Sequence, residues 1–318
     1  MKRSVVVLTL AGLAVGSSIF LRRVRRTFSF ANKVILITGG SRGLGLALAR
    51  QLCEEGARVA LLARDQNQLD KARDELIGTG GDVFTISCDL LERAHVETAV
   101  QKVVNRFGRL DVLINNAGII EVGPLDHMQR EDFERALNLH FWAPLDLTIK
   151  AIPHLRRSGN GRIVNIASIG GKVAVPHLAP YCASKFALVG LSDSLRAELA
   201  REHICVTTVT PGLMRTGSQG NAHFRGNHSA EHTWFSLSTA MPLSSISTEQ
   251  AAARIVSACR RGVPSLTFPF VAQAAILGNA LLPNVSGNVT KLVNTLLPSP
   301  TGPDGDVSRS GRELSDLL

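Results

Sequence analysis

A tyrosine and a lysine four residues apart form the pair of side chains in this sequence with the clearest chemical potential. Tyr181 is the only tyrosine of the chain, and Lys185 follows it on a segment that Pro180 opens as a helix. Four residues apart on a helix, the two side chains share a face, with Cβ atoms about 5–6 Å apart. An ammonium there lowers the cost of ionising a phenol, whose ordinary pKa is about 10. The pair is a candidate proton donor and acceptor, although a surface pair would have the same spacing.

Ser168 and Asn138 are weaker candidates for the same chemistry. Ser168 follows a predicted strand, where its hydroxyl could hydrogen-bond a substrate oxygen as charge develops, or could simply end the strand. Asn138 lies inside a predicted helix, where asparagine is a poor helix former. Its amide either caps a local kink or organises a water molecule near Lys185, and the sequence leaves both alternatives open.

A glycine-rich turn follows the first predicted strand and leads at once into a helix. Glycines let the backbone approach a pyrophosphate, which the unpaired N–H groups and the positive dipole end of the helix attract. The turn therefore predicts a dinucleotide site, although any tight strand-to-helix turn could use these glycines. The cofactor-binding candidates in it are Gly39, Ser41, Arg42, Gly43, Leu44 and Gly45.

The second predicted strand ends at Arg64, about twenty residues past the glycine turn, where an acid would hold the ribose hydroxyls of NAD. Arg42 in the turn could converge with Arg64 on a 2′-phosphate, a contact that suits guanidinium groups. Two solvated surface arginines are the alternative. The residues favour NADP over NAD.

Strand-like and helix-like segments alternate from residue 33 onward. Apolar β-branched runs predict strands buried on both faces, at residues 34–38, 58–63, 83–87, 112–115, 162–167 and 205–210. Longer segments predict helices over residues 44–55, 67–77, 92–107, 130–155 and 180–201. This alternation predicts an α/β fold, a single Rossmann-type doubly wound parallel sheet with helices on both faces. Ligands bind beyond the carboxyl ends of the strands of such sheets.

The remaining segments are expected to be additions to one domain. With 318 residues, 45% of them hydrophobic, the chain can bury a sizeable core, which excludes a disordered or collagen-like protein. We expect an NADP-binding Rossmann catalytic domain over residues 31–268, an apolar C-terminal extension over 269–297 and a disordered tail over 298–318. Residues 213–245 predict a substrate lid or a mobile insertion. The apolar extension is expected to close over the core, with lipid contact as the alternative.

The first 30 residues carry most of the net charge. Six of them are lysine or arginine and none is acidic, so residues 31–318 keep only +3 of the net charge of +9. A nearly balanced body argues against nucleic-acid binding. Residues 4–21 form an uncharged run of 18 residues, about 27 Å as a helix, just short of a hydrocarbon core of about 30 Å.

This pattern predicts an N-terminal hydrophobic helix with a basic flank over residues 1–30. We expect it to be an uncleaved, single-pass membrane anchor that leaves the catalytic domain cytoplasmic. A cleaved secretory signal and a mitochondrial presequence are the alternatives.

Cysteine and histidine do not predict a metal site. The five cysteines are widely spaced, lack C-x-x-C pairs and are interpreted as small buried residues. His223, His228 and His232 lie close together in the predicted lid, but a metal would need a rigid frame and a further ligand. We expect solvated loop histidines and no metal.

Over residues 32–263 the sequence resembles the main branch of the short-chain dehydrogenase/reductase family. The family's T-G-x-x-x-G-x-G pattern matches Thr38 to Gly45, and its N-N-A-G motif matches Asn115-Asn116-Ala117-Gly118. The resemblance implies that the catalytic set is Asn138, Ser168, Tyr181 and Lys185. The joint match of several spaced motifs is highly specific.

The resemblance also implies roles for residues that spacing alone does not single out. Asp89 would contact the adenine, while Asn116, Ala117 and Gly118 would support the cofactor site. Pro211 and Gly212 would border the nicotinamide, with Thr216 near its carboxamide, and Tyr181 and Lys185 would also contact the cofactor. Family members commonly dimerise or tetramerise through the two long helices, here residues 130–155 and 180–201.

Two functions from different classes remain open. The first is a membrane-anchored NADP(H)-dependent oxidoreductase that interconverts a carbonyl and a secondary alcohol on an apolar, lipid- or steroid-like substrate. The second is a catalytically silent NADP(H)-binding sensor or scaffold at a membrane. The intact pair of Tyr181 and Lys185, together with Ser168, favours the enzyme, because a binding module has no need for a phenol beside an ammonium.

Overall fold

Seven parallel strands form the central sheet of the computed structural model, which describes residues 28–240 and 245–315. The strands are β1 (Val34–Thr38), β2 (Arg58–Ala63), β3 (Asp82–Ser87), β4 (Val112–Asn115), β6 (Arg162–Ile166), β7 (Cys205–Pro211) and β11 (Ser265–Phe268). They lie in the order β11-β7-β6-β4-β1-β2-β3, so the strand order reverses between β1 and β4. Open parallel sheets bind ligands at such a reversal, beyond the carboxyl ends of the strands.

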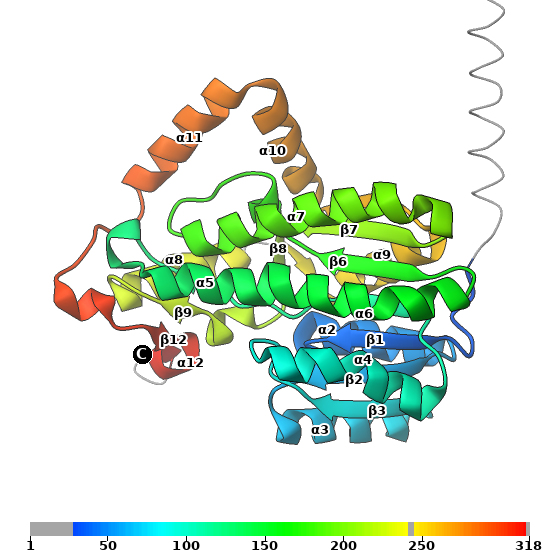
Figure 1. Cartoon of the computed structure of the whole chain (residues 1–318). Helices are drawn as coiled ribbons and strands as arrows, with labels where there is room; N and C mark the ends of the chain where they lie inside the picture. The colour runs from blue at the N-terminus through cyan, green and yellow to red at the C-terminus, as the bar shows by residue number, and fades with distance from the viewer. Residues whose placement is uncertain (1–27, 241–244, 316–318) are drawn as a thin grey trace, which may run out of the picture.

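Helices cover both faces of this sheet (Figure 1). Those on one face are α2 (Gly43–Glu54), α3 (Gln66–Gly78) and α9 (Thr248–Arg261), and those on the other include α4 (Arg93–Phe107), α6 (Ala143–Arg157) and α7 (Ala179–Leu199). Strand β1 is buried by both layers, because Val34 and Leu36 point into one apolar cluster and Ile35 and Ile37 into the other. The predicted Rossmann-type sheet is confirmed. The predicted N-terminal hydrophobic helix lies outside the described residues.

Residues 213–240 and Ser245 belong to folded elements and their short connections, where polar composition predicts a long loop. The elements here are β8 (Leu213–Arg215), η5 (Ser218–Asn221), β9 (His223–Phe224), α8 (His228–Ala240) and β10 (Ser245–Ser247). Phe235 of α8 packs against Phe224 of β9, with 6.0 Å between ring centroids. Phe224, Trp234 and Phe235 of this segment gather in one small core, a convergence that average composition does not reveal.

Helices α10 (Phe270–Leu281) and α11 (Pro283–Thr295) project from the body as an open hairpin (Figure 1). The structure describes both helices completely, and only Ala272 is buried in them. The prediction that the apolar extension closes over the core is therefore wrong, because the hairpin leaves its apolar residues exposed.

The chain after the hairpin returns to the body, where composition predicts a disordered tail. The tail forms η6 (Pro303–Asp306), β12 (Arg309–Ser310) and α12 (Gly311–Ser315). Strand β12 pairs with β9, and Leu314 is buried in the same small core as Phe224. The prediction of disorder is wrong for residues 298–315, because one leucine and a set of polar contacts hold this segment in place.

Histidines expected in solvated loops contribute to those contacts. His228 donates from Nε2 to the Val307 carbonyl oxygen at 2.6 Å, and His223 Nδ1 lies 3.5 Å from Ser308 Oγ. His232 is buried. All three therefore differ from the solvated state that the sequence predicts.

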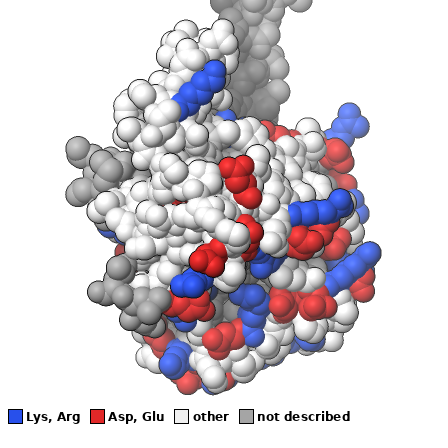
Figure 2. Space-filling view, turned by 90° about the vertical axis from the view of Figure 1, so that its left-hand side faces the viewer, with Lys and Arg blue, Asp and Glu red and all other residues white. Residues whose placement is uncertain are grey.

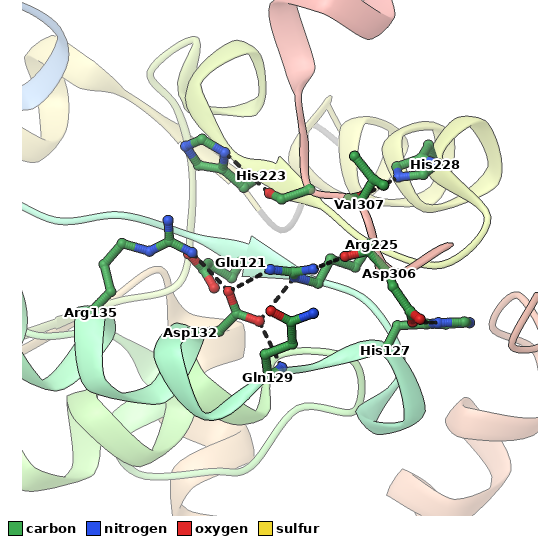
Figure 3. Close-up of polar contacts among 11 residues, drawn as sticks. Glu121, His127, Gln129, Asp132, Arg135, His223, Arg225, His228, Asp306 and Val307 are labelled. Carbon is green, nitrogen blue, oxygen red and sulfur yellow. Dashed lines mark hydrogen bonds and ion pairs between the residues drawn. The ribbon is translucent and has the colours of Figure 1, made fainter. Parts of the chain in front are cut away.

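A buried ionic cluster joins the tail to helix α5 (Arg130–Leu137) and strands β5 (Glu121–Val122) and β9 (Figure 3). Asp132 contacts the guanidinium group of Arg225 at 2.9 Å and that of Arg135 at 2.7 Å. Arg135 also lies 2.7 Å from the Glu121 carboxyl. From the tail, the Asp306 carbonyl oxygen accepts a hydrogen bond from Arg225. Arg225 thus connects the acids of the body to the backbone of the tail.

The two acids of this cluster differ in charge. Burial raises the pKa of Glu121 to about 8, and the neighbouring Asp132 adds to the rise. Burial also opposes ionisation of Asp132, but hydrogen bonds from the Gln129 backbone N–H and from Arg225 help to lower its pKa overall. At neutral pH Glu121 therefore favours its protonated form, while Asp132 is a carboxylate whose charge Arg225 and Arg135 balance.

Removal of the balancing charge should destabilise the protein. Arg225→Met is expected to lower the free energy of unfolding by about 3 kcal/mol, because it removes one of the two guanidinium groups that balance the buried Asp132 carboxylate. Urea unfolding followed by circular dichroism measures this loss. Arg130→Met is the matched control, since Arg130 pairs with Glu134 on the exposed face of α5 and should change stability little. Equal losses in the two variants would contradict the role given to Arg225.

Candidate active site

The predicted site residues meet at the carboxyl edge of the sheet, on both sides of the reversal between β1 and β4. Several candidates lie just after the end of a strand. Gly39 follows β1, Arg64 follows β2, Asn116 follows β4, Ser168 lies two residues after β6, and Gly212 follows β7. Tyr181 and Lys185 lie in the first two turns of α7. Parallel strands place their carboxyl ends together, which is why residues so far apart in sequence form one site.

The glycine turn is locked against the motif that follows β4. Gly39 has a left-handed φ of +64°, and a Cβ on it would lie 3.0 Å from Ala117 Cα. A Cβ on Gly45 would lie 2.1 Å from the Gly39 carbonyl oxygen, so both positions require glycine. Asn116 donates from Nδ2 to the Thr38 and Gly39 carbonyl oxygens at 2.9 and 3.2 Å. These contacts hold the turn open at the N-terminus of α2, where backbone N–H groups can meet a phosphate.

Three arginines lie near the end of the glycine turn. Burial lowers the pKa of the Arg42 guanidinium, and repulsion from Arg312 and then Arg64 lowers it further, while Asp65 opposes the shift. The predicted convergence of Arg42 and Arg64 is consistent with this repulsion. An anion placed among these groups would relieve it.

Arg312 is a further candidate for the cofactor site, and sequence reasoning missed it. It belongs to α12, in the segment predicted to be disordered. The Gly311 N–H donates to the Ala222 carbonyl oxygen at 2.9 Å, and Arg312 Cγ lies 3.6 Å from the Cβ position of Gly220 in η5. The tail thereby reaches the cofactor side of the sheet edge, a placement without any signal in the local sequence.

Tyr181 and Ser168 form the chemical center of the site. The ring of Tyr181 packs against the small core that contains Phe224. Burial raises the pKa of Tyr181 to about 12, and its hydrogen bond with Ser168 only partly offsets that rise. Ser168 Oγ also accepts a hydrogen bond from the Gly170 N–H at 3.0 Å, which fixes its position. At neutral pH the phenol is protonated and can donate its proton.

Lys185 lies beneath Tyr181 and is almost fully buried. Its Nζ donates to the Ile166 carbonyl oxygen at 2.9 Å and lies 5.7 Å from the center of the Tyr181 ring. Burial lowers the pKa of Lys185 to about 7. The helical pairing predicted from spacing is therefore present, but the expected lowering of the phenol pKa is not, because desolvation outweighs the attraction between the two groups.

His140 is a second residue that the sequence did not single out. Its Nε2 accepts a hydrogen bond from the Ile119 N–H at 3.1 Å, so Nδ1 carries the proton that Ser184 Oγ accepts at 2.7 Å. Burial, aided by the charge of Lys185, lowers the pKa of His140 well below 6.5. The neutral ring stands edge-on to Tyr181, with 5.6 Å between centroids, and ties the turn after β4 to α7.

Asn138 begins an irregular turn in the helix predicted over residues 130–155. That helix is interrupted by the π-helical turn η2 (Asn138–Trp142), in which the Ala143 N–H donates to the Asn138 carbonyl oxygen. Such turns are frequent at functional sites. The side chain of Asn138 is exposed, and its place in a water relay stays a prediction.

The other predicted cofactor residues lie along the same edge. A Cβ on Gly118 would lie 3.0 Å from His140 Nε2 and 3.7 Å from Lys185 Nζ, so this glycine borders the catalytic candidates. The Thr216 carbonyl oxygen lies 3.6 Å from the Cβ position of Gly43. Their contacts with a cofactor stay predictions, as do those of Ser41, Leu44, Asp89 and Pro211. Within residues 28–240 and 245–315, no group of three or more His, Cys, Asp or Glu side chains could hold a metal ion.

Comparison with known proteins agrees with this geometry. Residues 33–224 match the family model described as short chain dehydrogenase. The 11-beta-hydroxysteroid dehydrogenase-like 4A protein of Arabidopsis thaliana is 37% identical over 201 residues, which cover 63% of this chain and 67% of that protein.

Two solved structures share the fold. The L-sorbose reductase of Gluconobacter frateurii, complexed with NADPH and L-sorbose, has a TM-score of 0.69 and 26% identity, over 76% of this chain and 97% of that one. An actinorhodin polyketide ketoreductase with NADPH has a TM-score of 0.65 and 30% identity, over 74% of this chain and 95% of that one.

Burial of Lys185 should cost the folded protein stability. The unfolded chain binds the lysine proton up to a pH near 10.5, but the folded protein binds it only up to about 7, so stability rises with pH between these values. Lys185→Met removes this penalty, although it leaves the Ile166 carbonyl oxygen without its donor. Without added nucleotide, the variant should be more stable by roughly 2 kcal/mol at pH 7 and below, and the gain should fade toward pH 10.5.

Urea unfolding at several pH values measures this gain. Lys150→Met is the matched control, because Lys150 is exposed on α6 and its removal should leave stability unchanged at every pH. A Lys185→Met variant that is less stable than the parent at pH 7, or equally stable at all pH values, would show that burial of this ammonium is not costly.

Proposed function

The chain belongs to the short-chain dehydrogenase family, and we propose that it is an NADP(H)-dependent oxidoreductase that interconverts a carbonyl and a secondary alcohol. The placement of Tyr181 next to Ser168 carries this proposal: Ser168 Oγ accepts from the Gly170 N–H at 3.0 Å, and a Cβ on Gly170 would lie 3.2 Å from Tyr181 Cε1. It supports a site where one substrate oxygen receives a proton from a phenol and a hydrogen bond from a second hydroxyl. A silent NADP(H)-binding sensor, the alternative that the sequence leaves open, has no use for this pair.

Each side chain has a defined task in this mechanism. NADP(H) supplies or accepts the hydride when it is bound. In the direction of reduction, Tyr181 donates its proton to the carbonyl oxygen, and Ser168 orients that oxygen with a hydrogen bond. Lys185 stabilises the phenolate that remains, because its ammonium form lies beneath the ring. Asn138 takes part in the water relay that returns a proton, and oxidation uses the same groups in reverse.

The residues present fit NADP(H). The glycine turn and the N-terminus of α2 would hold the pyrophosphate. Arg42, Arg64 and Arg312 would hold the 2′-phosphate, because mutual repulsion acts on Arg42 and an anion relieves it. Both solved relatives named above are complexes with NADPH, which supports the same choice here.

A cleft lies at the start of α7, between the turn after β5, the loop before α7 and the chain after α11. It has a volume of about 490 Å³, within the usual range for small-molecule sites, and its lining includes Ala179 but none of Asn138, Ser168, Tyr181 and Lys185. Leu125, Val175 and Leu297 contribute to its walls. The name of the 11-beta-hydroxysteroid dehydrogenase-like relative adds support for an apolar, lipid- or steroid-like substrate.

Membrane location and self-association are also part of the proposal. The single-pass anchor over residues 1–30, with the body on the cytoplasmic side, rests on the sequence, because residues 1–27 lie outside the described part. Among the described residues, no helix combines the length and apolarity that a membrane span needs. Trp142, Ile149 and Phe186, exposed by 52, 53 and 44%, support a homodimer or homotetramer through α6 and α7.

Loss of the phenol hydroxyl should abolish turnover but not cofactor binding. Tyr181→Phe is expected to reduce turnover of NADPH with a ketone by about 10²–10⁴-fold, the usual contribution of a general acid. Steroid, retinoid, acyl and sphingoid ketones are the substrates to screen, with NADPH absorbance as the readout. NADPH binding, followed by fluorescence, should stay the same. Unchanged turnover in the variant would refute the role of Tyr181, and binding without turnover in the parent would favour the silent sensor.

The arginines should set the preference for NADPH over NADH. Arg42→Ala, Arg64→Ala and Arg312→Ala are each expected to raise the KM for NADPH roughly tenfold, the effect of one charge-assisted hydrogen bond. The KM for NADH should change little. Arg309→Ala is the control, because this exposed arginine lies on the tail three residues before Arg312. A parallel rise in both KM values would show that the arginines do not recognise the 2′-phosphate.

A further inference from the structure

The hairpin of α10 and α11 carries most of the exposed large apolar side chains that the structure describes. The most exposed, Leu296 and Phe270, have 79 and 77% of their surface accessible. Figure 2 shows the projection as a surface with little charge, above a body with many charged groups. The exposed apolar residues are Phe270, Val271, Leu277, Leu281, Leu282, Val285, Val289, Leu292, Val293 and Leu296.

Helix α10 exposes its apolar side chains and turns its polar side chains toward the body, the reverse of an ordinary surface helix. Its polar side chains face the body, where Gln273 Nε2 donates to the Thr267 carbonyl oxygen at 2.7 Å and Asn279 Nδ2 to that of Lys172 at 3.3 Å. Its apolar stripe faces outward. A surface helix in water buries its apolar stripe and exposes its polar side. The outward face of α10 is therefore suited to apolar surroundings.

Helix α11 lacks support from the rest of the chain. It has 13 residues, all of them described, and none is buried. Isolated helices of this length are marginal in water, and most helices in proteins gain their stability from an apolar face packed on a neighbour. The apolar face of α11 is formed by Val285, Val289, Leu292 and Leu296, at helical spacing. A partner for this face must come from outside the described chain.

The geometry points to a lipid bilayer as that partner, and we propose that the hairpin inserts into the interfacial layer of a membrane. The hairpin is a protrusion with exposed apolar residues on both helices, which acyl chains can surround on all sides. Helices of 12 and 13 residues are about 18–20 Å long, too short to cross a hydrocarbon core of about 30 Å. They fit insertion into one leaflet. The single charged residue of the hairpin, Lys291, has the sign that phospholipid headgroups attract.

The chain outside the described part supports the same partner. Residues 1–27 contain the uncharged run over residues 4–21 and its basic flanks. The first described residue, Phe28, donates from its backbone N–H to the Arg260 carbonyl oxygen, near the end of α9. The chain passes from α9 through the edge strand β11 into α10. The described chain thus begins beside the last turn of α9, whereas the hairpin leaves from the carboxyl end of β11.

Fluorescence quenching by lipid tests the insertion. The full chain with Leu281→Cys, at the apex of the hairpin, is labelled with an environment-sensitive dye and reconstituted into phosphatidylcholine vesicles that carry a spin label on the upper acyl chain. The lipid label should quench this dye at least about threefold more than a dye on Ile77→Cys, an exposed apolar site on α3. Leu292→Cys on α11 should behave as Leu281→Cys does. The unsubstituted chain measures any labelling of Cys53 and Cys205, which are only partly buried.

Two results would overturn the proposal. Quenching at Leu281→Cys no stronger than at Ile77→Cys would show that the hairpin stays outside the bilayer, even if the N-terminal segment holds the protein there. Energy transfer between donor- and acceptor-labelled Leu281→Cys copies that persists at high lipid excess, without quenching, would show that a second copy covers the hairpin. Circular dichroism and NADPH oxidation verify that the labelled variants are folded, which is expected because Leu281 and Leu292 are exposed by 68 and 64%.

Discussion

The site depends on one constraint: the Tyr181 phenol and the Lys185 ammonium are both removed from water at the same buried position. Burial raises the pKa of Tyr181 to about 12 and lowers that of Lys185 to about 7, so each group is driven toward its neutral form. Neutral phenol is the form that donates a proton, and a lysine that titrates near neutral pH can respond to charge on its neighbour. This buried environment therefore favours proton transfer at neutral pH without a permanent ion pair between Tyr181 and Lys185.

The fold holds this unfavourable burial in place. Tyr181 is fixed by the perpendicular His140 ring, with 5.6 Å between centroids, and Lys185 by the Ile166 carbonyl oxygen at 2.9 Å. These partners come from β6, η2 and α7, elements that meet only because parallel strands end at one edge. The packing of the sheet, rather than the site itself, thus provides the free energy that offsets the burial of Tyr181 and Lys185. His140 is important for the same reason, since its neutral ring joins the turn after β4 to α7.

The sequence predicts the structure correctly where a local pattern of residues can be packed in only one way. An unalternating apolar run such as that of β1 must be buried on both faces, and a close contact such as that at Gly45 admits only glycine. It fails where the outcome depends on a distant surface. Leu314 orders a tail of polar composition because a small apolar core already stands across from it, and Arg312 reaches the cofactor edge for the same reason. The pKa of Tyr181 likewise depends on burial, which spacing does not encode.

The hairpin is attached at both ends to the parts of the sheet edge that concern the cofactor. At its start, Ala272 of α10 is packed on Gly212, where a Cβ would lie 3.2 Å from the Ala272 Cβ. At its end, the chain returns as the tail, and the Asp306 carboxylate lies 2.7 Å from His127 Nδ1. The same tail carries Arg312 to the arginine cluster. A hairpin held in a bilayer would therefore fix the orientation of the sheet edge to the membrane, with both the residues after β7 and the tail positioned by its two attachments.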